Sequence, residues 1–280
     1  MSVDLNRLVD HVVFLASTAS NKIREAVDRH DPATLNVRRK SSFADLVTDL
    51  DVEIEEEIVA GLEDLLPGSL VIGEELLRDG SRDLFWTVDP IDGTTNVVHG
   101  VPHAATAVAL WQGGSPTMAV VCDPFAGTAY TAVRGAGAFR RTFAEGADRV
   151  ALAVSRVSSL SDALIAFGLP YDRSLGPHIF EVAGEVFARC QDMRRGGSAS
   201  LDLVSVASGS FDAYLELELR PWDIGAGGLV LEEAGGRLTA WHGGSVYDPD
   251  REARSNVLAT NGALHEQLLA LTEPRRWRVA

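Results

Sequence analysis

The stretch Asp89–Asn96, which reads DPIDGTTN, brings two carboxylates, a proline, a glycine and two threonines together directly after an apolar segment. The preceding residues 84–88, LFWTV, are apolar and β-prone and therefore predict a buried strand. Pro90 cannot donate to a sheet ladder and Gly93 tolerates positive φ, so we expect the chain to leave the strand here. On its own the stretch fits either a polar turn or a metal site.

The composition predicts a globular and strongly acidic protein. Its 280 residues are 46% hydrophobic, and its 40 Asp and Glu exceed its 25 Lys and Arg, which gives a net charge of −15. A surface of this sign repels nucleic acid and anionic lipid, so we expect neither as a main partner. It also repels an anionic substrate, unless a bound cation reverses the local field.

Cysteine usage and hydropathy narrow the class of protein further. Cys122 and Cys190 are too few for a disulfide framework or a four-cysteine zinc site, and Cys190 is predicted to pack on an apolar helical face with Phe180 and Phe187. The N-terminus has no signal-peptide pattern, and no run of about 18 apolar residues could span a bilayer. We therefore expect a soluble, cytoplasmic protein.

Apolar periodicity predicts the order of elements. Helical spacing dominates roughly the first 65 residues, apart from a connector at residues 31–51 that is expected to contain a short hairpin. Residues 70–140 are short β-prone segments between turns and predict an antiparallel sheet. The remaining chain alternates strands and helices, including a helix over residues 176–193. The predicted fold class is α/β with α+β layers, in which helix and sheet layers alternate.

Two halves are expected from this change of pattern. Residues 1–143 form an N-terminal α+β half that carries most of the candidate metal ligands and the antiparallel sheet. Residues 144–280 form a C-terminal α/β half with a second sheet, which closes the site.

Carboxylates near the predicted strand ends suggest a magnesium site. Magnesium takes oxygen ligands at about 2 Å, usually one or two carboxylates together with waters and phosphate oxygens. Asp89 and Asp92 lie around one turn and can aim at a single point, and the Ile91 carbonyl between them is expected to be free of the ladder. A second ion would need further acids. The candidates are Glu74 and Glu75 after a strand, Asp223 at one helix start and Asp51 near another.

These acids also have structural interpretations. Two glutamates after a strand are typical of a solvated turn, and an aspartate such as Asp223 is typical of a helix N-cap. Residues 49–57 read as the wet face of an amphipathic helix, to which we assign Glu53, Glu55, Glu56 and Glu57. Calcium-loop, Walker, dinucleotide, cysteine-phosphatase and HExxH patterns are not matched.

The motifs GEE, DPIDGTTN and WDIGAG occur in this order, together with KSSFADLVTDLD, GGSASLDLVSVASGSFDAYLE and ATN. With them the chain resembles the inositol monophosphatase family, which comprises magnesium-dependent, lithium-sensitive phosphatases related to fructose-1,6-bisphosphatase. The resemblance covers nearly the whole chain. Gly225 departs from it, because alanine is more usual at that place in the second motif.

The resemblance implies a role for each candidate residue. Two or three Mg²⁺ ions would be held by Glu74, Asp89, Asp92, Asp223 and the carbonyl of Ile91. Glu74 and Thr94 would position the attacking water, with Asp51 in support. The substrate would be bound by Asp92, Gly93, Thr94, Ala199, Glu216 and Asp223. The implied substrate is a small phosphorylated polyol or sugar, with inositol 1-phosphate first, and the implied assembly is a homodimer.

Three other activities of the same superfamily stay open: fructose-1,6-bisphosphatase, 3′(2′),5′-bisphosphate nucleotidase and histidinol-phosphate phosphatase. Arg194, Arg195 and Arg220 are candidates for gripping a second phosphate. A non-catalytic regulatory or assembly protein is the alternative from a different class. A metal-dependent hydrolysis assay separates the two classes.

Overall fold

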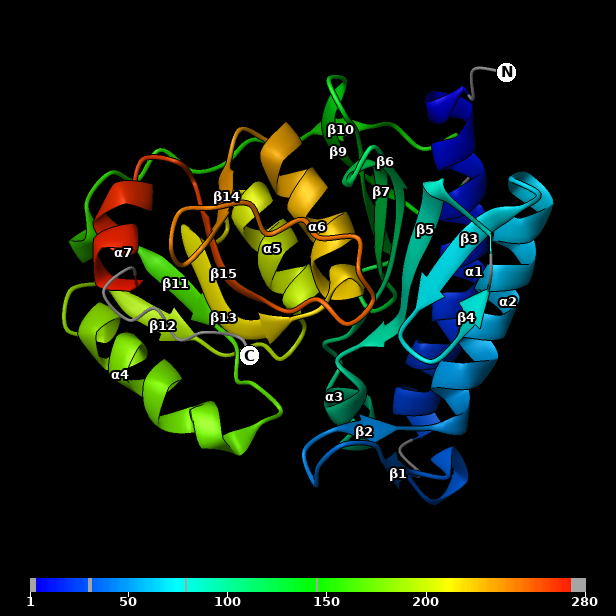
Figure 1. Ribbon diagram of the computed structural model, residues 1–280, viewed down its shortest axis with the longest axis horizontal. Helices are drawn as coiled ribbons and strands as arrows, with labels where there is room; N and C mark the ends of the chain where they lie inside the picture. The colour runs from blue at the N-terminus through cyan, green and yellow to red at the C-terminus, as the bar shows by residue number, and fades with distance from the viewer. Residues whose placement is uncertain (1–3, 30–31, 79, 145, 273–280) are drawn as a thin grey trace.

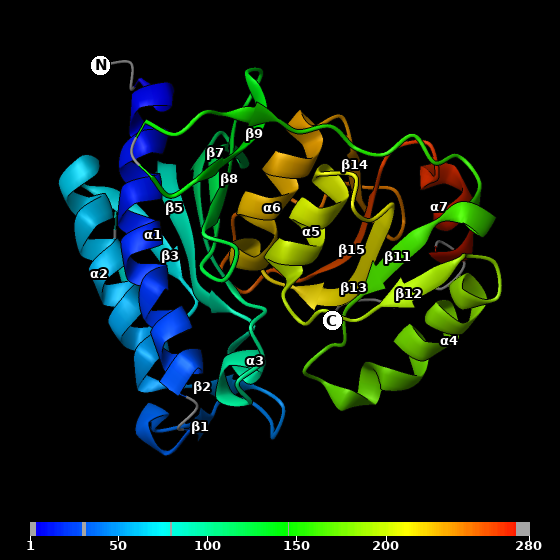
Figure 2. The same ribbon diagram turned by 180° about the vertical axis from the view of Figure 1, so that it is seen from behind.

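The computed structural model describes residues 4–29, 32–78, 80–144 and 146–272. Helices and sheets alternate in five layers, as Figures 1 and 2 show from opposite sides. From one side to the other, the layers are α1 (Leu5–Arg29) with α2 (Asp49–Leu65), a first sheet, α5 (Ala199–Ala207) with α6 (Pro221–Glu233), a second sheet, and α4 (Gly176–Phe187) with α7 (His265–Thr272). The predicted fold class is confirmed.

The first sheet has eight strands, and one of its strand pairs differs from the prediction. Every neighbouring pair is antiparallel except β3 and β5, which run parallel. The short edge strand β4 carries the chain back to the start of β3, so β5 sets out in the same direction as β3. In spatial order the strands are β10 (Val150–Ala151), β9 (Gly137–Thr142), β8 (Thr128–Val133), β7 (Ser115–Asp123), β6 (Ala105–Gln112), β5 (Ser81–Asp92), β3 (Ser69–Gly73) and β4 (Leu77–Arg78).

The second sheet is mixed and contains a strand that the sequence did not predict. Its order is β12 (Asp192–Arg194), β11 (Leu164–Phe167), β13 (Ala213–Leu219), β15 (Ser255–Thr260) and β14 (Arg237–Ala240). The first three strands are parallel, and the remaining pairs are antiparallel. The helix predicted over residues 176–193 is too long, because residues 192–194 leave it to pair with β11.

The predicted packing of Cys190 is also wrong in its partners. Helix α4 ends at Phe187, before the cysteine, and Phe180 and Phe187 are 57% and 64% exposed. The apolar stripe of α4 that does face the core consists of Ile179, Val182, Ala183 and Val186.

The connector between α1 and α2 contains the predicted hairpin, formed by β1 (Arg38–Arg39) and β2 (Leu46–Val47). Residue 31, where the predicted connector begins, lies outside the described residues. The short helix α3 (Thr94–Val98) and three 3₁₀ turns, η1 (Pro32–Leu35), η2 (Leu160–Asp162) and η3 (Arg173–Leu175), complete the elements. Among the described residues, no helix is long and apolar enough to cross a membrane.

The apolar core follows the layers. One cluster lies between α1, α2 and the first sheet, a second surrounds α5 and α6 between the sheets, and a third packs α4 and α7 on the second sheet. Helix α6 contacts β5 through β9 of the first sheet, although it follows them by about a hundred residues in the chain. The central layer thus brings the start of α6 to the ends of β3 and β5. The division at residues 143 and 144 stays a prediction.

Candidate active site

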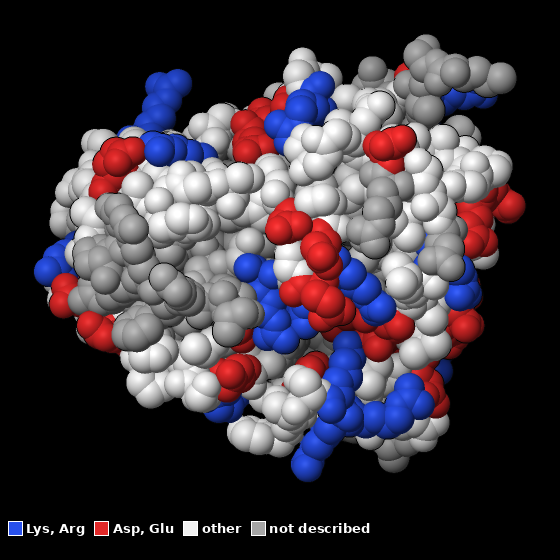
Figure 3. All heavy atoms as spheres, in the orientation of Figure 1, with Lys and Arg blue, Asp and Glu red and all other residues white. Residues whose placement is uncertain are grey.

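A cavity of about 700 Å³ lies where β3 and β5 end and where α5 and α6 begin. Its wall includes four acids predicted from the sequence, Glu74, Asp89, Asp92 and Asp223, together with Ile91 and Gly93. Arginines and Lys40 surround these acids, so charges of both signs meet at one hollow of the surface (Figure 3). The fold therefore gathers residues from positions 40 to 254 around one pocket.

The end of β5 keeps more strand character than the sequence predicts. The ladder with β6 skips Pro90 and Ile91 and resumes where Asp92 pairs with Ala105. The chain bulges instead of leaving the sheet, because Thr106 donates its hydroxyl to the Pro90 carbonyl at 2.9 Å. This bulge turns the carboxylates of Asp89 and Asp92 toward the pocket.

Asp89 is a buried acid with an unused acceptor. Its side chain is 2% exposed, and its Oδ1 atom has no hydrogen-bond partner among the described residues. Burial, followed by the carboxylates of Glu74, Asp92 and Asp223, raises the pKa of Asp89 well above its usual value. Such a group requires a proton or a cation.

Asp92 joins the end of β5 to the start of α5. Its Oδ2 accepts hydrogen bonds from the Ser198 hydroxyl at 2.9 Å and the Ser200 amide at 2.5 Å, and its Oδ1 accepts one from the Ala199 amide at 3.1 Å. An anion at a helix N-terminus is favoured by the helix dipole and the free amides. Burial nevertheless raises the pKa of Asp92 above its usual value.

Asp223 lies in the first turn of α6. This confirms the predicted position at a helix start, but Arg220 occupies the N-cap position, so the alternative interpretation of Asp223 as an N-cap does not hold. Asp223 Oδ2 accepts a hydrogen bond from the Arg220 amide at 2.7 Å, which fixes the side chain at the helix start. Burial and the nearby Asp92 raise the pKa of Asp223 well above its usual value.

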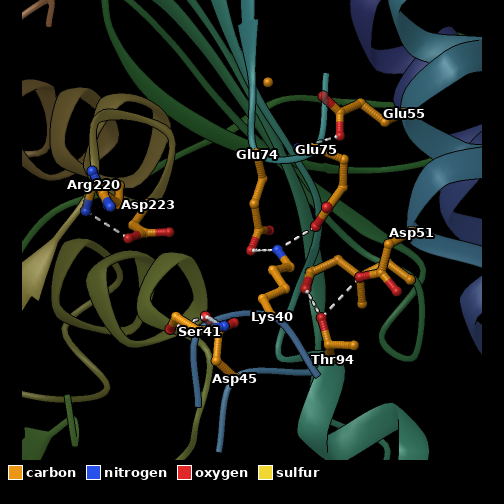
Figure 4. Close-up of polar contacts among 12 residues, drawn as sticks. Lys40, Ser41, Asp45, Asp51, Glu55, Glu74, Glu75, Thr94, Arg220 and Asp223 are labelled. Carbon is orange, nitrogen blue, oxygen red and sulfur yellow. Dashed lines mark hydrogen bonds and ion pairs between the residues drawn. The ribbon is translucent and has the colours of Figure 1, made fainter. Parts of the chain in front are cut away.

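Glu74 forms an ion pair with a lysine that was not among the predicted site residues. Lys40, from the β1–β2 hairpin, lies 2.6 Å from Glu74 and also pairs with Glu75, as Figure 4 shows. Burial raises the pKa of Glu74 to about 7, although Lys40 opposes the shift. Burial disfavours the charge on Lys40, but the two glutamates raise its pKa above the usual value. Both glutamates of the GEE motif therefore face one ammonium group.

Thr94 connects the remaining predicted catalytic groups. Its Oγ1 lies 2.9 Å from Asp51 Oδ1 and 3.0 Å from the Ile91 carbonyl, which is free of the β5–β6 ladder as predicted but lies within reach of this hydroxyl (Figure 4). Asp51 is held in turn by Thr48, whose amide and hydroxyl donate to Oδ2 at 2.8 and 2.5 Å. Because Asp51 accepts from Thr94, the lone pairs of the hydroxyl remain available.

Gly93 precedes α3 and has a φ of 109°, a positive value of the kind that the sequence predicted this glycine could adopt. A Cβ atom there would lie 3.1 Å from the His103 carbonyl, so the close approach also favours glycine. Across the pocket, Glu216 on β13 accepts a hydrogen bond from the Tyr214 hydroxyl, and burial raises the pKa of Glu216 to about 7. Ala199 contributes to the pocket wall beside Asp92.

The three arginines considered for binding a second phosphate do not all lie at the pocket. Arg195 and Arg220 are among the described residues that line the pocket, whereas Arg194 is not. Arg194 pairs with Asp192 at 2.5 Å on the outer strand β12, and Arg220 pairs with Glu252 at 3.2 Å.

Glu55 was assigned to the wet face of α2, and this assignment is wrong. The side chain is fully buried, and its carboxylate accepts the amides of Glu75 at 2.9 Å and Leu76 at 3.0 Å. Burial raises the pKa of Glu55 to about 8. The sequence did contain a signal that Glu55 is buried. Glu55 lies four residues after Asp51 and one after Ile54, on the helical stripe that continues to Ile58. Lys40 gave no comparable signal in its connector.

The donor chemistry of the pocket suits a hard divalent cation. The acids supply oxygen atoms only, Asp89 has an unused oxygen, and Lys40 already places a positive charge at Glu74. Within the described parts of the chain, however, no three acidic, histidine or cysteine side chains converge closely enough to hold an ion. The acids repel one another without a cation, so we expect them to draw together when one binds.

Known proteins resemble this chain over most of its length. A profile of the inositol monophosphatase family matches residues 4–276. The Nus factor SuhB of Pasteurella multocida is 34% identical over 87% of this chain and 88% of its own length, and the chloroplastic phosphatase IMPL1 of Arabidopsis thaliana is 32% identical over 95% and 70%. The solved inositol monophosphatase of Anabaena superposes with a TM-score of 0.79 at 30% identity, covering 96% of both chains. With this match and the pocket geometry, the chain belongs to the inositol monophosphatase family.

Proposed function

We propose that this protein is a magnesium-dependent phosphomonoesterase that hydrolyses a polyol or sugar phosphate, with inositol 1-phosphate as the first candidate. The observation that carries the proposal is the group of buried acids around one pocket, with Oδ1 of Asp89 left without a hydrogen-bond partner among the described residues and the pKa of Asp89 well above the usual value. Ionised acids repel a phosphate ester, and a bound cation removes this repulsion.

The residues proposed to hold Mg²⁺ are Glu74, Asp89, Asp92, Asp223 and the carbonyl of Ile91. When bound, Mg²⁺ supplies positive charge to the phosphate oxygens and makes water more acidic. Glu74, with its pKa near 7, is suited to accept a proton from the attacking water.

Thr94 is proposed to orient that water. Asp51 holds the Thr94 hydroxyl proton at 2.9 Å, so the Thr94 oxygen can accept a hydrogen bond from the water. The amides of Gly93 and Thr94 at the start of α3 are proposed to contact the phosphate. The side chain of Thr94 would then link the water and the phosphate within one short turn.

The leaving alcohol is proposed to lie against β13 and α5. Glu216 can accept hydrogen bonds from vicinal hydroxyls, and Ala199 leaves room beside it. Glu216 and Asp92 belong to different predicted halves of the chain, so the substrate would span both. A homodimer remains the proposed assembly.

A second candidate is a regulatory role without catalysis, which the name Nus factor SuhB of the Pasteurella relative favours. Arg195 and Arg220 in the pocket wall favour a bisphosphorylated substrate as a variant of the first candidate.

A substrate panel tests these alternatives. Phosphate release is measured with Mg²⁺, and with EDTA as the control, from inositol 1-phosphate, fructose 1,6-bisphosphate, adenosine 3′,5′-bisphosphate and histidinol phosphate. The proposal expects Mg²⁺-dependent release that is fastest with inositol 1-phosphate, and inhibition by lithium. Release from no substrate at any Mg²⁺ concentration would support the regulatory role.

A further inference from the structure

The turn that follows β3, residues 73–76, is held by side chains from two distant parts of the chain. Within the turn, the Gly73 amide donates to the Leu76 carbonyl at 2.9 Å, and the Glu74 amide donates to Val88 of β5 at 3.1 Å. These two bonds use the backbone amides of Gly73 and Glu74. The amides of Glu75 and Leu76 and the carbonyls of Gly73 and Glu74 are engaged by side chains instead.

Glu55 holds the turn from the side of α2. Its two carboxylate oxygens each accept one amide, from Glu75 and Leu76, and Figure 4 shows the side chain reaching the turn from the helix. The fit is close, because a Cβ atom on Gly73 would lie 1.5 Å from Glu55 Oε1. Because each oxygen of the buried carboxyl group accepts one backbone amide, this contact fixes the turn in position.

Arg251 holds the same turn from the C-terminal half. Its Nη2 atom donates to the Glu74 carbonyl at 3.2 Å and lies 3.4 Å from the Gly73 carbonyl. Its guanidinium lies 6.0 Å from the ring centre of Trp222, and Arg220 donates to the Arg251 carbonyl at 3.3 Å. Trp222 directly precedes Asp223, so Arg251 connects the Glu74 turn to the start of α6.

We propose that Glu55 and Arg251 are positioning residues, which hold the Glu74 turn in register with Asp223 so that the bound Mg²⁺ ions can reach both carboxylates. The inference rests on the proposed function, although neither residue is among the proposed ligands. Glu55 accepts the amides of the turn and Arg251 donates to its carbonyls, so the turn is held from both sides. A displacement of about 1 Å at such a group is enough to lower a rate by about 10².

The first experiment compares Glu55→Gln with Glu56→Gln in the full-length protein. Both changes replace a carboxyl group by an amide, but Glu56 is exposed on the same helix. In Glu55→Gln, the new side-chain amide would set a donor against one of the two backbone donors. Hydrogen exchange of residues 73–78 in the metal-free protein should rise by about tenfold or more in Glu55→Gln, as expected when a buried hydrogen bond to a backbone amide is lost.

Calorimetric titration with Mg²⁺ is the second readout of the same pair of variants. The Mg²⁺ affinity of Glu55→Gln should fall by about tenfold, because the Glu74 carboxylate is no longer held in place. Glu56→Gln should match the wild type in both exchange and affinity. Equal exchange and equal affinity in the two variants would overturn the proposal.

If Glu55→Gln does not fold, Arg251→Gln tests the proposed positioning role instead. Its control is Arg237→Gln, since Arg237 pairs with Glu266 away from the pocket. Arg251→Gln should keep its melting temperature and lose Mg²⁺ affinity by about tenfold, with kcat reduced more than KM is raised. Unchanged Mg²⁺ affinity in Arg251→Gln would contradict the proposed link. Because exchange and calorimetry do not need turnover, a wild type that binds Mg²⁺ but hydrolyses no ester would refute the proposed function alone.

Discussion

Asp92 illustrates how one side chain can serve both the fold and the site. Its oxygens accept three hydrogen bonds from the start of α5, while the side chain also lines the pocket. Asp92→Asn should therefore lower the melting temperature as well as turnover, because the new amide nitrogen would face backbone donors. We expect a loss of about 1–3 kcal/mol in the free energy of unfolding. Urea denaturation measures this loss, and unchanged stability would mean that the α5 contacts do not hold in solution.

His265 provides a residue-scale test that is independent of the site. It lies between the hydroxyls of Thr239 and Thr260 at 3.0 Å each, and burial lowers its pKa from 6.5 to about 4. The unfolded chain therefore binds this proton more readily, and the contribution of His265 to stability should be lost as the pH falls from about 6.5 to 4.

The matched variant His265→Gln isolates this effect. The stability difference between wild type and variant should be largest above pH 6.5 and shrink toward pH 4, as followed by urea denaturation at several pH values. A difference that stays constant with pH would show that His265 does not titrate as described.

At the scale of elements, α6 depends on small residues where it packs. A Cβ atom on Gly227 would lie 2.8 Å from Leu203 Cβ of α5, whereas one on Gly225 would lie 3.0 Å from Thr87 and Trp111. Gly227→Ala should therefore destabilise the protein by about 1–3 kcal/mol through overpacking. Gly225→Ala, which restores the residue usual in the family, should be nearly neutral, since gained helix propensity of about 1 kcal/mol offsets the tight contact.

Thermal denaturation of these two variants tests the packing of α6. Mg²⁺ affinity serves as the control, because neither glycine is a proposed ligand. Equal stability of Gly227→Ala and the wild type would contradict the close contact between α5 and α6.

The elements that the sequence predicted well are those with strong local signals. The β5 strand and its polar end and the alternating elements after residue 150 follow from periodicity and turn residues. The parallel pairing of β3 with β5 and the strand β12 depend on tertiary contacts, which local patterns do not encode.

The same distinction holds within the site. The predicted acids come together because each lies at the end of a strand or in the first turn of a helix. Lys40, Glu55 and Arg251 were not predicted as site residues, because their partners lie 20 to 178 residues away in the chain. Glu55 nevertheless carried a local signal, its place on the apolar stripe of α2, and Lys40 opens the motif KSSFADLVTDLD.

On the scale of the whole molecule, a protein with a net charge of −15 concentrates buried acids in one pocket. In the metal-free protein, burial raises the pKa of Glu74 to about 7 and of Asp89 and Asp223 well above the usual values. At these acids the native state therefore binds more protons than the unfolded chain, so their contribution to stability should fall as the pH rises from about 4 to 7.

Added Mg²⁺ should reverse this loss. Because the ion must displace protons, the rise in melting temperature at saturating Mg²⁺ should be larger at about pH 8 than at about pH 6. Matched ionic strength with NaCl provides the control. If Mg²⁺ does not raise the melting temperature, or raises it equally at the two pH values, the acids do not exchange protons for the ion.

The most direct test of the central claim is phosphate release from inositol 1-phosphate by the wild type and Asp89→Asn, with Mg²⁺ or EDTA. Asn preserves the shape of a side chain whose Oδ1 has no partner in the described chain, so the fold should be retained. We predict Mg²⁺-dependent release by the wild type and a rate lower by about 10²–10⁴ in Asp89→Asn, with no loss of melting temperature. Release in EDTA, or a near-wild-type rate in Asp89→Asn, would contradict the account.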